Sequence, residues 1–487
     1  MGGARGSSLT SDGSLRRIDE ALWEIPAGAR ADMRVPARVF ADEELLDAIR
    51  TDRSLEQLQN VATLPGIVDA ALALPDIHQG YGFPVGGLAA IDPADGIVSP
   101  GGVGYDINCG VRLLVAPLTA AELGDRKETL VHEISRRAPA GAGREAALKL
   151  KGADLDRVLR EGPAALLELQ GIGTDDDVER TESRGCLDAA DPGAVSERAR
   201  QRGSGQLGTV GSGNHFVEVQ RVERLFDEEA SRAFGLEPGA VTILIHSGSR
   251  GLGHQVCTDY VKRMDAALPG YGFQLPDRQL ACAPLSSREG RDYLGAMAAA
   301  ANFAWANRAA IAHSVREAIR EVLGDAAADG TRQVYDVAHN VAKMEPYGGR
   351  DLCVHRKGAT RAFPPGHPEI PAVYREAGQP VFIPGSMGTS SFVLAGRQGS
   401  MERSFGTTCH GAGRRLSRTA ARKRIQGSEL RRQLEADGIT VRCPSNRGLT
   451  EEAPFAYKDV EAVVNVVERA GLAARVAQLR PIGVVKG

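Results

Sequence analysis

The chain has 487 residues, 42% of them hydrophobic, so it is long enough to bury a large core in one or more domains. Its formal net charge of −3 excludes a protein that holds nucleic acid by bulk electrostatics, because such proteins carry a clear basic excess. The 7 cysteines are odd in number and lack the spacing of a disulfide scaffold, which favours a reducing compartment, and we expect a cytoplasmic protein.

Hydrophobic periodicity predicts helices and strands that alternate along the chain. We expect residues 1–17, which open with Gly and Ser, to be a disordered leader, and residues 18–487 to form the folded part. The predicted helices cover residues 43–62, 120–137, 293–323 and 459–479, and the predicted strands cover residues 241–246, 332–339 and 380–385. The polar segment 136–202 is typical of an insertion. This alternation favours a mixed α/β or α+β fold over segregated domains.

An alanine-rich run inside the third predicted helix is interrupted by polar residues. Asn302, Asn307 and Arg308 break the run from residue 298 to residue 312, so it does not read as a membrane span. No secretory signal opens the sequence either. We therefore expect no membrane contact.

Several common catalytic motifs are absent from the sequence. There is no G-x-x-x-x-G-K-[ST], no G-x-S-x-G and no H-E-x-x-H. The lysine signature K-x-D-G of ordinary nucleotidyltransferase ligases is also missing. If this protein attaches a nucleotide to itself, another side chain must be the nucleophile.

Histidines beside glycines or at strand ends suggest a metal site. Asp106 and Cys109 lie three residues apart in a glycine-flanked loop, His215 follows a glycine turn, and His246 and His339 each end a predicted strand. Taken singly, each is more often a buried cysteine, a turn aspartate or a hydrogen-bonded core histidine. Together they suit two metal ions bridged by the thiolate, a pair that suits phosphoryl transfer. Sulfur and imidazole ligands favour zinc over manganese, so the residues alone leave the metal open.

The segment FGTTCHGAGRR, residues 405–415, carries a different kind of histidine. His410 is followed by small residues and then by Arg414 and Arg415, which would let a phosphate approach the imidazole for nucleophilic attack. The alternative is a turn histidine before a helix that starts near Leu416. The loop PGSMGTSSF, residues 384–392, offers backbone N–H groups and hydroxyls to a nucleotide, or is only a turn.

A local basic cluster is the best candidate for an RNA contact. The alternative is the solvated face of the helix near Leu416. The cluster consists of Arg403, Arg414, Arg415, Arg418, Arg422, Lys423 and Arg424.

Over residues 18–487 the sequence resembles the RtcB family of RNA ligases. The segments that carry the resemblance, in chain order, are DINCG, GSGNHF, HSGSRG, AHN, PGSMGTSS, the histidine before GAGR, and VVKG. The resemblance implies a single compact α+β catalytic domain with central β-sheets and surrounding helices, which is not one of the common superfolds.

The resemblance also implies roles for individual residues. One Mn(II) would be held by Asp106, Cys109 and His215, and a second by Cys109, His246 and His339. His410 would be the catalytic nucleophile that carries GMP. The residues implied to bind GTP are Asn214, His215, Phe216, Val217, Glu218, His339, Asn340, Pro384, Gly385, Ser386, Met387, Ser391, His410, Gly411, Ala412, Gly413 and Lys486.

The implied reaction joins an RNA 3′-phosphate or 2′,3′-cyclic phosphate end to a 5′-hydroxyl end, through a histidine–GMP intermediate and a guanylated RNA 3′ end. The setting would be tRNA splicing or RNA repair, with an archease-type activator as a possible partner. Two alternatives stay open: a dinuclear metal-dependent phosphoesterase and a non-catalytic RNA-binding component. No firm role follows for Asp76, His78, His254 or Arg250: the first two would orient ligands or be structural, and Arg250 would grip RNA phosphate.

Overall fold

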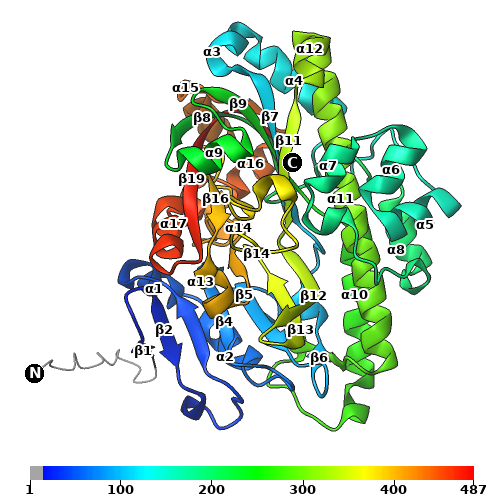
Figure 1. Cartoon of the computed structure of the whole chain (residues 1–487), viewed down its shortest axis with the longest axis vertical. Coiled ribbons are helices and arrows are strands. Elements are labelled where there is room, and N and C mark those ends of the chain that lie inside the picture. The colour runs from blue at the N-terminus through cyan, green and yellow to red at the C-terminus, as the bar shows by residue number, and fades with distance from the viewer. Residues whose placement is uncertain (1–14) are drawn as a thin grey trace, which may run out of the picture.

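Two large β-sheets form the framework of the protein, which the computed structural model describes over residues 15–487. The first sheet has seven strands and lies in the lower part of the view in Figure 1. All of its neighbouring strands are antiparallel except β3 and β4. Its strands, in spatial order, are β1 (Arg16–Arg17), β2 (Leu22–Ile25), β3 (Ala37–Phe40), β4 (Ala71–His78), β5 (Val85–Ile91), β13 (Arg350–Lys357) and β12 (Asn340–Tyr347).

The second sheet has eight strands and carries most of the residues discussed below. Its main path is antiparallel throughout, and β18 (Thr440–Arg442) pairs in parallel with β19. The path runs through β11 (Arg332–Ala338), β7 (Gly110–Thr119), β9 (Ala240–Ser247), β8 (Phe216–Leu225), β19 (Ala473–Lys486), β16 (Ser391–Gly396) and β15 (Pro380–Ile383). Two small sheets pair β6 (Ile97–Val98) with β10 (Ala283–Pro284), and β14 (Ala359–Arg361) with β17 (Thr407–Cys409). Helices and sheets in one compact body confirm the α+β prediction.

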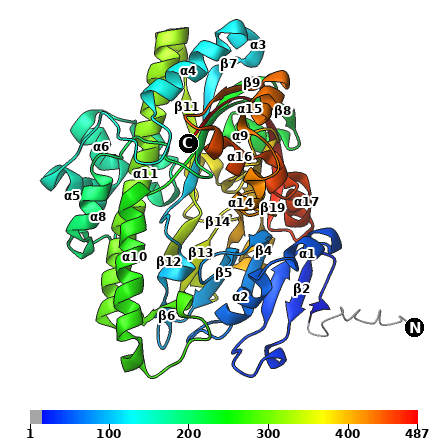
Figure 2. The same ribbon diagram turned by 180° about the vertical axis from the view of Figure 1, so that it is seen from behind.

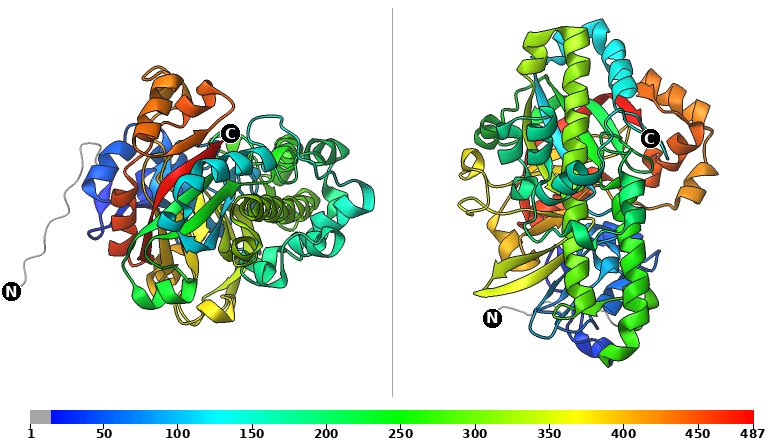
Figure 3. Two further views of the ribbon diagram at one scale, coloured as in Figure 1. Left: turned by 90° about the horizontal axis from the view of Figure 1, so that it is seen from above. Right: turned by 90° about the vertical axis from the view of Figure 1, so that its right-hand side faces the viewer.

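Two long helices, α10 (Arg250–Ala267) and α11 (Arg288–Leu323), run side by side along one flank (Figure 3). The side chain of Ser287 accepts a hydrogen bond from the N–H of Gly290 and so caps the start of α11. None of the helices in the described part of the chain is long and apolar enough to cross a membrane.

The segment 136–202 forms small helices that pack against one another and against the two long helices, as Figures 1 and 2 show from opposite sides. These are α5 (Gly152–Glu161), α6 (Pro163–Gln170), α7 (Asp175–Glu179) and α8 (Glu197–Gly203). The remaining short helices are α9 (Glu228–Phe234), α12 (Asp325–Asp329), α13 (Gln398–Ser404), α14 (Arg418–Arg422), α15 (Gly427–Ala436) and α16 (Asn446–Glu451).

Most of the predicted elements are confirmed, with boundaries set by capping. The region 43–62 forms two helices, α1 (Glu43–Ile49) and α2 (Ser54–Val61), and the region 120–137 forms α3 (Ala120–Leu123) and α4 (Lys127–Arg137). The three predicted strands are β9, β11 and β15, and the predicted helix 293–323 is α11.

The predicted helix 459–479 is wrong in its second half. Helix α17 (Val460–Arg469) ends before Gly471, which has a φ of 70° that ends a right-handed helix. From Ala473 the chain forms β19 instead, and Pro481 would in any case exclude a continued helix.

The predicted leader falls mainly outside the described residues and stays a prediction there. Within the described part, Arg16 and Arg17 pair with Glu24 and Trp23 in the β1–β2 hairpin.

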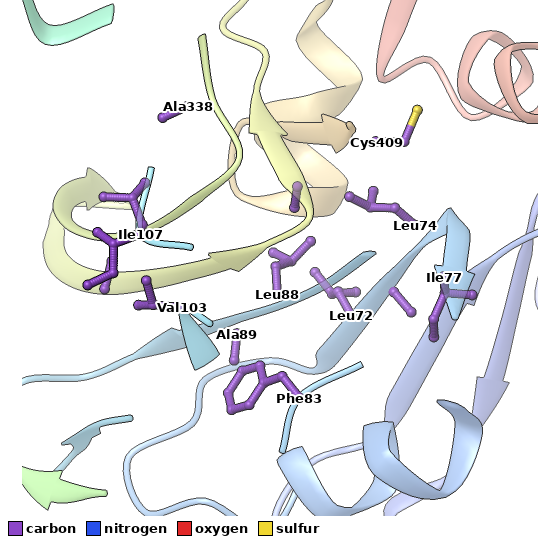
Figure 4. Close-up of a cluster of buried hydrophobic side chains, with 14 of the residues drawn as sticks. Leu72, Leu74, Ile77, Phe83, Leu88, Ala89, Val103, Ile107, Ala338 and Cys409 are labelled. Atoms are coloured by element: carbon purple, nitrogen blue, oxygen red, sulfur yellow. The ribbon is translucent and has the colours of Figure 1, made fainter. Parts of the chain in front are cut away.

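The apolar core reaches the residues next to the predicted site. Figure 4 shows Leu72 and Leu88 of the first sheet in one buried cluster with Ile107, Ala338 and Cys409. These last three residues immediately follow or precede predicted site residues at positions 106, 339 and 410. Core packing therefore anchors three separate segments of the predicted site.

Candidate metal and nucleotide site

A cavity of about 310 Å³ opens where the ends of several strands meet. Most of the predicted site residues line it, although they come from distant parts of the sequence. Those that line it are Asp106, Cys109, Asn214, His215, His246, His339, Asn340, Pro384, Gly385, His410, Gly411, Ala412 and Gly413.

The first group of donor atoms gathers around Cys109. The ligand atoms of Asp106, Cys109 and His215 all lie within 4.8 Å of one another. His215 Nε2 is 2.7 Å from Asp106 Oδ2, and Cys109 Sγ is 3.4 Å from His215 Nε2 and 3.2 Å from His246 Nε2. The thiol thus lies between two imidazoles, which is the position required of a bridging ligand.

His339 lies on the other side of this group. Its ring centroid is 5.6 Å from that of His246 and 5.3 Å from that of His410. His339 Nδ1 lies 2.8 Å from Thr360 Oγ1, while its Nε2 is buried and has no hydrogen-bond partner. An imidazole held at one nitrogen, with the other buried and unpaired, is typical of a metal ligand.

The protonation of these groups suits cation binding. Burial lowers the pKa of His246 and His339 well below the usual range, so both rings are neutral and keep a free lone pair. Burial and the Asp106 carboxylate raise the pKa of the Cys109 thiol, while the charge of Arg308 opposes that shift. A metal ion would have to displace the thiol proton, as metals do at thiolate sites. Carboxylate, thiolate and imidazole together fit a divalent transition metal.

His410 is held by a buried carboxylate from the first sheet. Asp76 Oδ2 lies 2.5 Å from His410 Nδ1 and accepts a second hydrogen bond, of 3.0 Å, from the His410 backbone N–H. The Asp76 side chain is fully buried in β4. Because Asp76 engages Nδ1, Nε2 is the ring nitrogen left for chemistry, and its lone pair is fixed in direction.

Gly413 allows the His410 loop to close against β4. Its φ is 73°, and a Cβ at this position would lie 2.2 Å from the carbonyl oxygen of Asp76. The glycine is therefore required both by the backbone conformation and by this close approach.

The remaining residues implied to bind GTP lie behind the cavity wall. Phe216 packs edge-on against His246, with ring centroids 5.4 Å apart, and Lys486 Nζ lies 5.3 Å from the centre of the Phe216 ring. Val217 points to the opposite face of β8, into a separate apolar cluster. The same second layer contains Ser386, Met387 and Ser391.

Glu218 and Lys486 are buried ionisable groups in this second layer. Burial raises the pKa of Glu218 to about 8 and lowers the pKa of Lys486 to about 8. Gln220 Nε2 donates to Glu218 and also to Ser391 Oγ, 3.0 Å away, which accepts from the Gly385 N–H as well. This network joins β8 to the loop at residues 384–391.

The basic cluster divides into separate parts, and the interpretation as one solvated helix face is wrong for Arg414. Helix α14 is only five residues long. Arg414 Nη1 pairs with Glu452 Oε2 at 2.8 Å, and the half-exposed Arg418 pairs with Glu452 Oε1 at 2.9 Å. Arg403 lies elsewhere and pairs with Asp19.

Tyr457 lines the cavity and connects Asn214 to the buried Glu452. Glu452 is almost fully buried, and its pKa is lowered because the charges of Lys486, Arg418 and Arg414 outweigh the effect of burial. The Tyr457 hydroxyl contacts Glu452 and lies 3.0 Å from Asn214 Oδ1. Sequence reasoning missed both residues, because neither lies in a glycine- or histidine-rich segment.

The four residues without a firm predicted role have clear contacts. Arg250 Nη1 lies 3.1 Å from His215 Nδ1, so it supports the donor group from behind. His254 packs against Tyr105 with ring centroids 4.9 Å apart. His78 Nδ1 lies 3.0 Å from the Asp76 carbonyl oxygen. Asp76 contacts both the ring and the backbone N–H of His410, so it fixes the orientation of that ring.

The sequence is similar to known proteins over nearly its whole length. The sequence model of one family, described as tRNA-splicing ligase RtcB, matches residues 57–487. A tRNA-splicing ligase RtcB from Thermococcus kodakarensis is 52% identical over 478 residues, which cover 97% of this chain and 99% of that protein. One from Archaeoglobus fulgidus is 50% identical over 98% of this chain and 100% of its own length. An RNA-splicing ligase RtcB from Mycobacterium tuberculosis is 50% identical over 88% of this chain and 100% of its own length.

Proposed function

Because the chain belongs to the RtcB family, we propose that it is a GTP-dependent RNA ligase in which His410 is the nucleophile. The observation that carries the proposal is the position of His410 between Asp76 and the donor group. Its Nδ1 is engaged by a buried carboxylate, and its ring lies 5.3 Å from that of His339. A histidine oriented in this way beside a cation site is suited to attack phosphorus.

In the first step, His410 Nε2 attacks the α-phosphorus of GTP, the bond to the β-phosphate breaks, and pyrophosphate leaves. The product is a phosphoramidate between His410 and GMP. Asp76 keeps the ring in the reactive orientation and favours the positive charge that develops on the imidazole during attack. The uncharged polar side chains of Asn214 and Ser391, together with the buried Glu218, would form hydrogen bonds to the nucleotide.

In the later steps, an RNA 3′-phosphate oxygen attacks the guanylate phosphorus and frees His410. A 2′,3′-cyclic phosphate must first be opened by water. The RNA 5′-hydroxyl then attacks the activated 3′-phosphate and GMP leaves. A phosphate monoester needs this activation because it is a poor electrophile without a good leaving group.

Two Mn(II) ions would be held by Asp106, Cys109, His215, His246 and His339. When bound, the ions supply neutralising charge for the phosphates. The donor chemistry fits such ions, although soft sulfur and imidazole ligands favour zinc as well.

The RNA is expected to approach over the arginines near the cavity. The exposed Arg415 and the half-exposed Arg418 lie on this side and suit phosphate contacts. The substrate would be cleaved tRNA or damaged RNA in the cytoplasm, with an archease-type protein as a possible activator. Free cysteines fit this reducing setting: none of the seven is in a disulfide in the described residues.

The decisive experiment is transfer of label from GTP to the protein. With radiolabel at the α-phosphorus and Mn²⁺ present, the wild type should acquire acid-labile label, and His410→Ala should acquire none. His367→Ala is the matched control, because His367 stacks on Phe363 with ring centroids 3.7 Å apart and does not line the cavity. Label retained by His410→Ala would contradict the proposal.

A dinuclear phosphoesterase is the second candidate, because the ligand atoms of Asp106, Cys109 and His215 lie within 4.8 Å of one another without any group from the His410 loop. It predicts metal-dependent hydrolysis of a model phosphodiester that survives His410→Ala. A non-catalytic RNA-binding protein has less support, because neither the donor group nor the Asp76–His410 pair is needed for binding RNA.

A further inference from the structure

Helix α11 carries two buried polar residues that face the donor group rather than solvent. Asn307 and Arg308 are both fully buried, in the alanine-rich run that they interrupt. Burying an amide and a guanidinium in a helix core is costly unless each finds partners. The hydrogen-bond partners of Asn307 and Arg308 therefore indicate the role of each side chain.

Arg308 forms hydrogen bonds to residues that lie close in the sequence to Cys109, His246 and His339. Its Nη1 donates to the carbonyl oxygens of Asn108, at 2.8 Å, and Ser247, at 2.9 Å. Its Nη2 donates to Asp336 Oδ1, at 2.7 Å. In the sequence Asn108 precedes Cys109, Ser247 follows His246, and Asp336 lies three positions before His339.

Asn108 is the most constrained of these partners. Its φ is 48°, a left-handed conformation that asparagine adopts more readily than most other residues with a Cβ. Arg308 Nη2 donates to the Asn108 side-chain oxygen at 3.0 Å, and the Asn108 amide donates to the Ala301 carbonyl oxygen at 2.8 Å. Helix α11 thus holds both the backbone and the side chain of the residue before Cys109.

Asn307 fixes the turn that follows His246. Its Nδ2 donates to Ser247 Oγ at 3.0 Å and to the Gly248 carbonyl oxygen at 3.1 Å, and its Oδ1 accepts from the Gly208 N–H at 2.7 Å. Gly248 packs directly against Asp106: a Cβ on Gly248 would lie 2.4 Å from Asp106 Oδ1. A shift of this turn would therefore move both His246 and Asp106.

We propose that Asn307 and Arg308 are positioning residues that set the geometry of the cation site. They connect the loops of Asp106, Cys109 and His246 to one rigid helix, so that the donor atoms stay close together without a cation. The proposal rests on the metal site included in the proposed function. Groups that orient metal ligands in this way change metal affinity by about 10- to 100-fold.

Asn302 provides a matched control on the same helix. It is equally buried, but its amide binds the Leu159 and Arg160 carbonyl oxygens and the Leu187 N–H, in the helical segment at residues 152–203. It therefore serves packing of that segment and makes no contact with the donor loops.

The experiment titrates Mn²⁺ into the metal-free full chain by calorimetry, for the wild type, Arg308→Lys, Asn307→Ala and Asn302→Ala. Arg308→Lys keeps the positive charge beside Asp336 but loses the planar fork. We expect Arg308→Lys and Asn307→Ala to bind Mn²⁺ about tenfold more weakly or worse. Asn302→Ala should keep wild-type affinity while its thermal midpoint falls. Co²⁺ is a second probe, because its absorption reports thiolate and imidazole ligation, and the spectrum should change only in the first two variants.

Wild-type affinity and spectra in both positioning variants would overturn the proposal, as would an equal loss in Asn302→Ala. If Arg308→Lys does not fold, the result for Asn307→Ala decides the test, because that substitution leaves the buried ion pair between Arg308 and Asp336 intact. Failure of the metal site in the proposed function looks different, because the wild type itself would then bind no cation, and failure of the ligase chemistry appears only in the GTP-labelling experiment.

Discussion

The two sides of the cavity are built differently. On the metal side, Cys109 and His339 adjoin the ends of long buried strands, β7 and β11, and His246 lies within β9, with helix α11 behind all three. On the nucleotide side, His410 follows the three-residue strand β17, and the neighbouring arginines are tied by ion pairs to Glu452. Packing therefore preforms the metal side. The nucleotide side is held mainly by ion pairs, so its structure should respond more to substrate, pH and salt.

The largest effect that tests this contrast is loss of the bridging thiol. Cys109→Ala should abolish cation-dependent stabilisation, because the sulfur lies between His215 and His246. Wild type with a cation at 100 times its dissociation constant should gain about 2.7 kcal/mol of unfolding free energy. Thermal melts with and without Mn²⁺ measure the difference, and Cys282→Ala, a buried thiol outside the cavity, is the control. Equal stabilisation of Cys109→Ala would remove Cys109 from the metal site.

A smaller effect is expected when the nucleophile loses its orientation. Asp76→Asn keeps the size of the side chain but removes the charge beside His410 Nδ1, so the ring can turn or change tautomer. We expect single-turnover labelling from GTP to slow about 100-fold, while Mn²⁺ affinity is unchanged. If Mn²⁺ affinity fell in parallel, the two sides would not be independent.

The smallest effect concerns the pH dependence of stability on the nucleotide side. Burial raises the pKa of Glu218 to about 8 from 4.5, so the folded state retains a proton that the unfolded state loses between these values. Its contribution to the free energy of unfolding therefore falls as pH rises from 4.5 to 8, by at most about 1.4 kcal/mol per pH unit. Denaturation of Glu218→Gln should show a flatter profile over this window. An identical slope in wild type and variant would place the titration elsewhere.

More of the residues on the metal side than on the nucleotide side could be predicted from the sequence. Asp106, Cys109 and His215 lie in glycine-rich loops, His246 and His339 lie at strand ends, and the ends of neighbouring strands meet in space. Their roles as ligands stay predictions, but the structure brings their side chains to one cavity. Strand order could not be predicted, because β19 pairs with β8 across most of the sequence.

The nucleotide side depends on contacts that no local pattern records. The Asp76–His410 pair joins β4 to the loop after β17, and its partners are far apart in the sequence. Glu452 and Tyr457 lie in segments with ordinary composition. The failed helix prediction at residues 473–479 has the same origin, since short runs of alanine and valine fit either structure until pairing with β8 and β16 decides.

The candidate site draws on β4 near the beginning of the described chain and, behind the cavity wall, on Lys486 in β19 near its other end. No contiguous piece of the described chain contains the whole candidate site, so cleavage of a connecting loop, or exchange of one segment for a foreign one, would disturb residues from several distant segments. Most of the chain must also be synthesised before Asp76 can pair with His410.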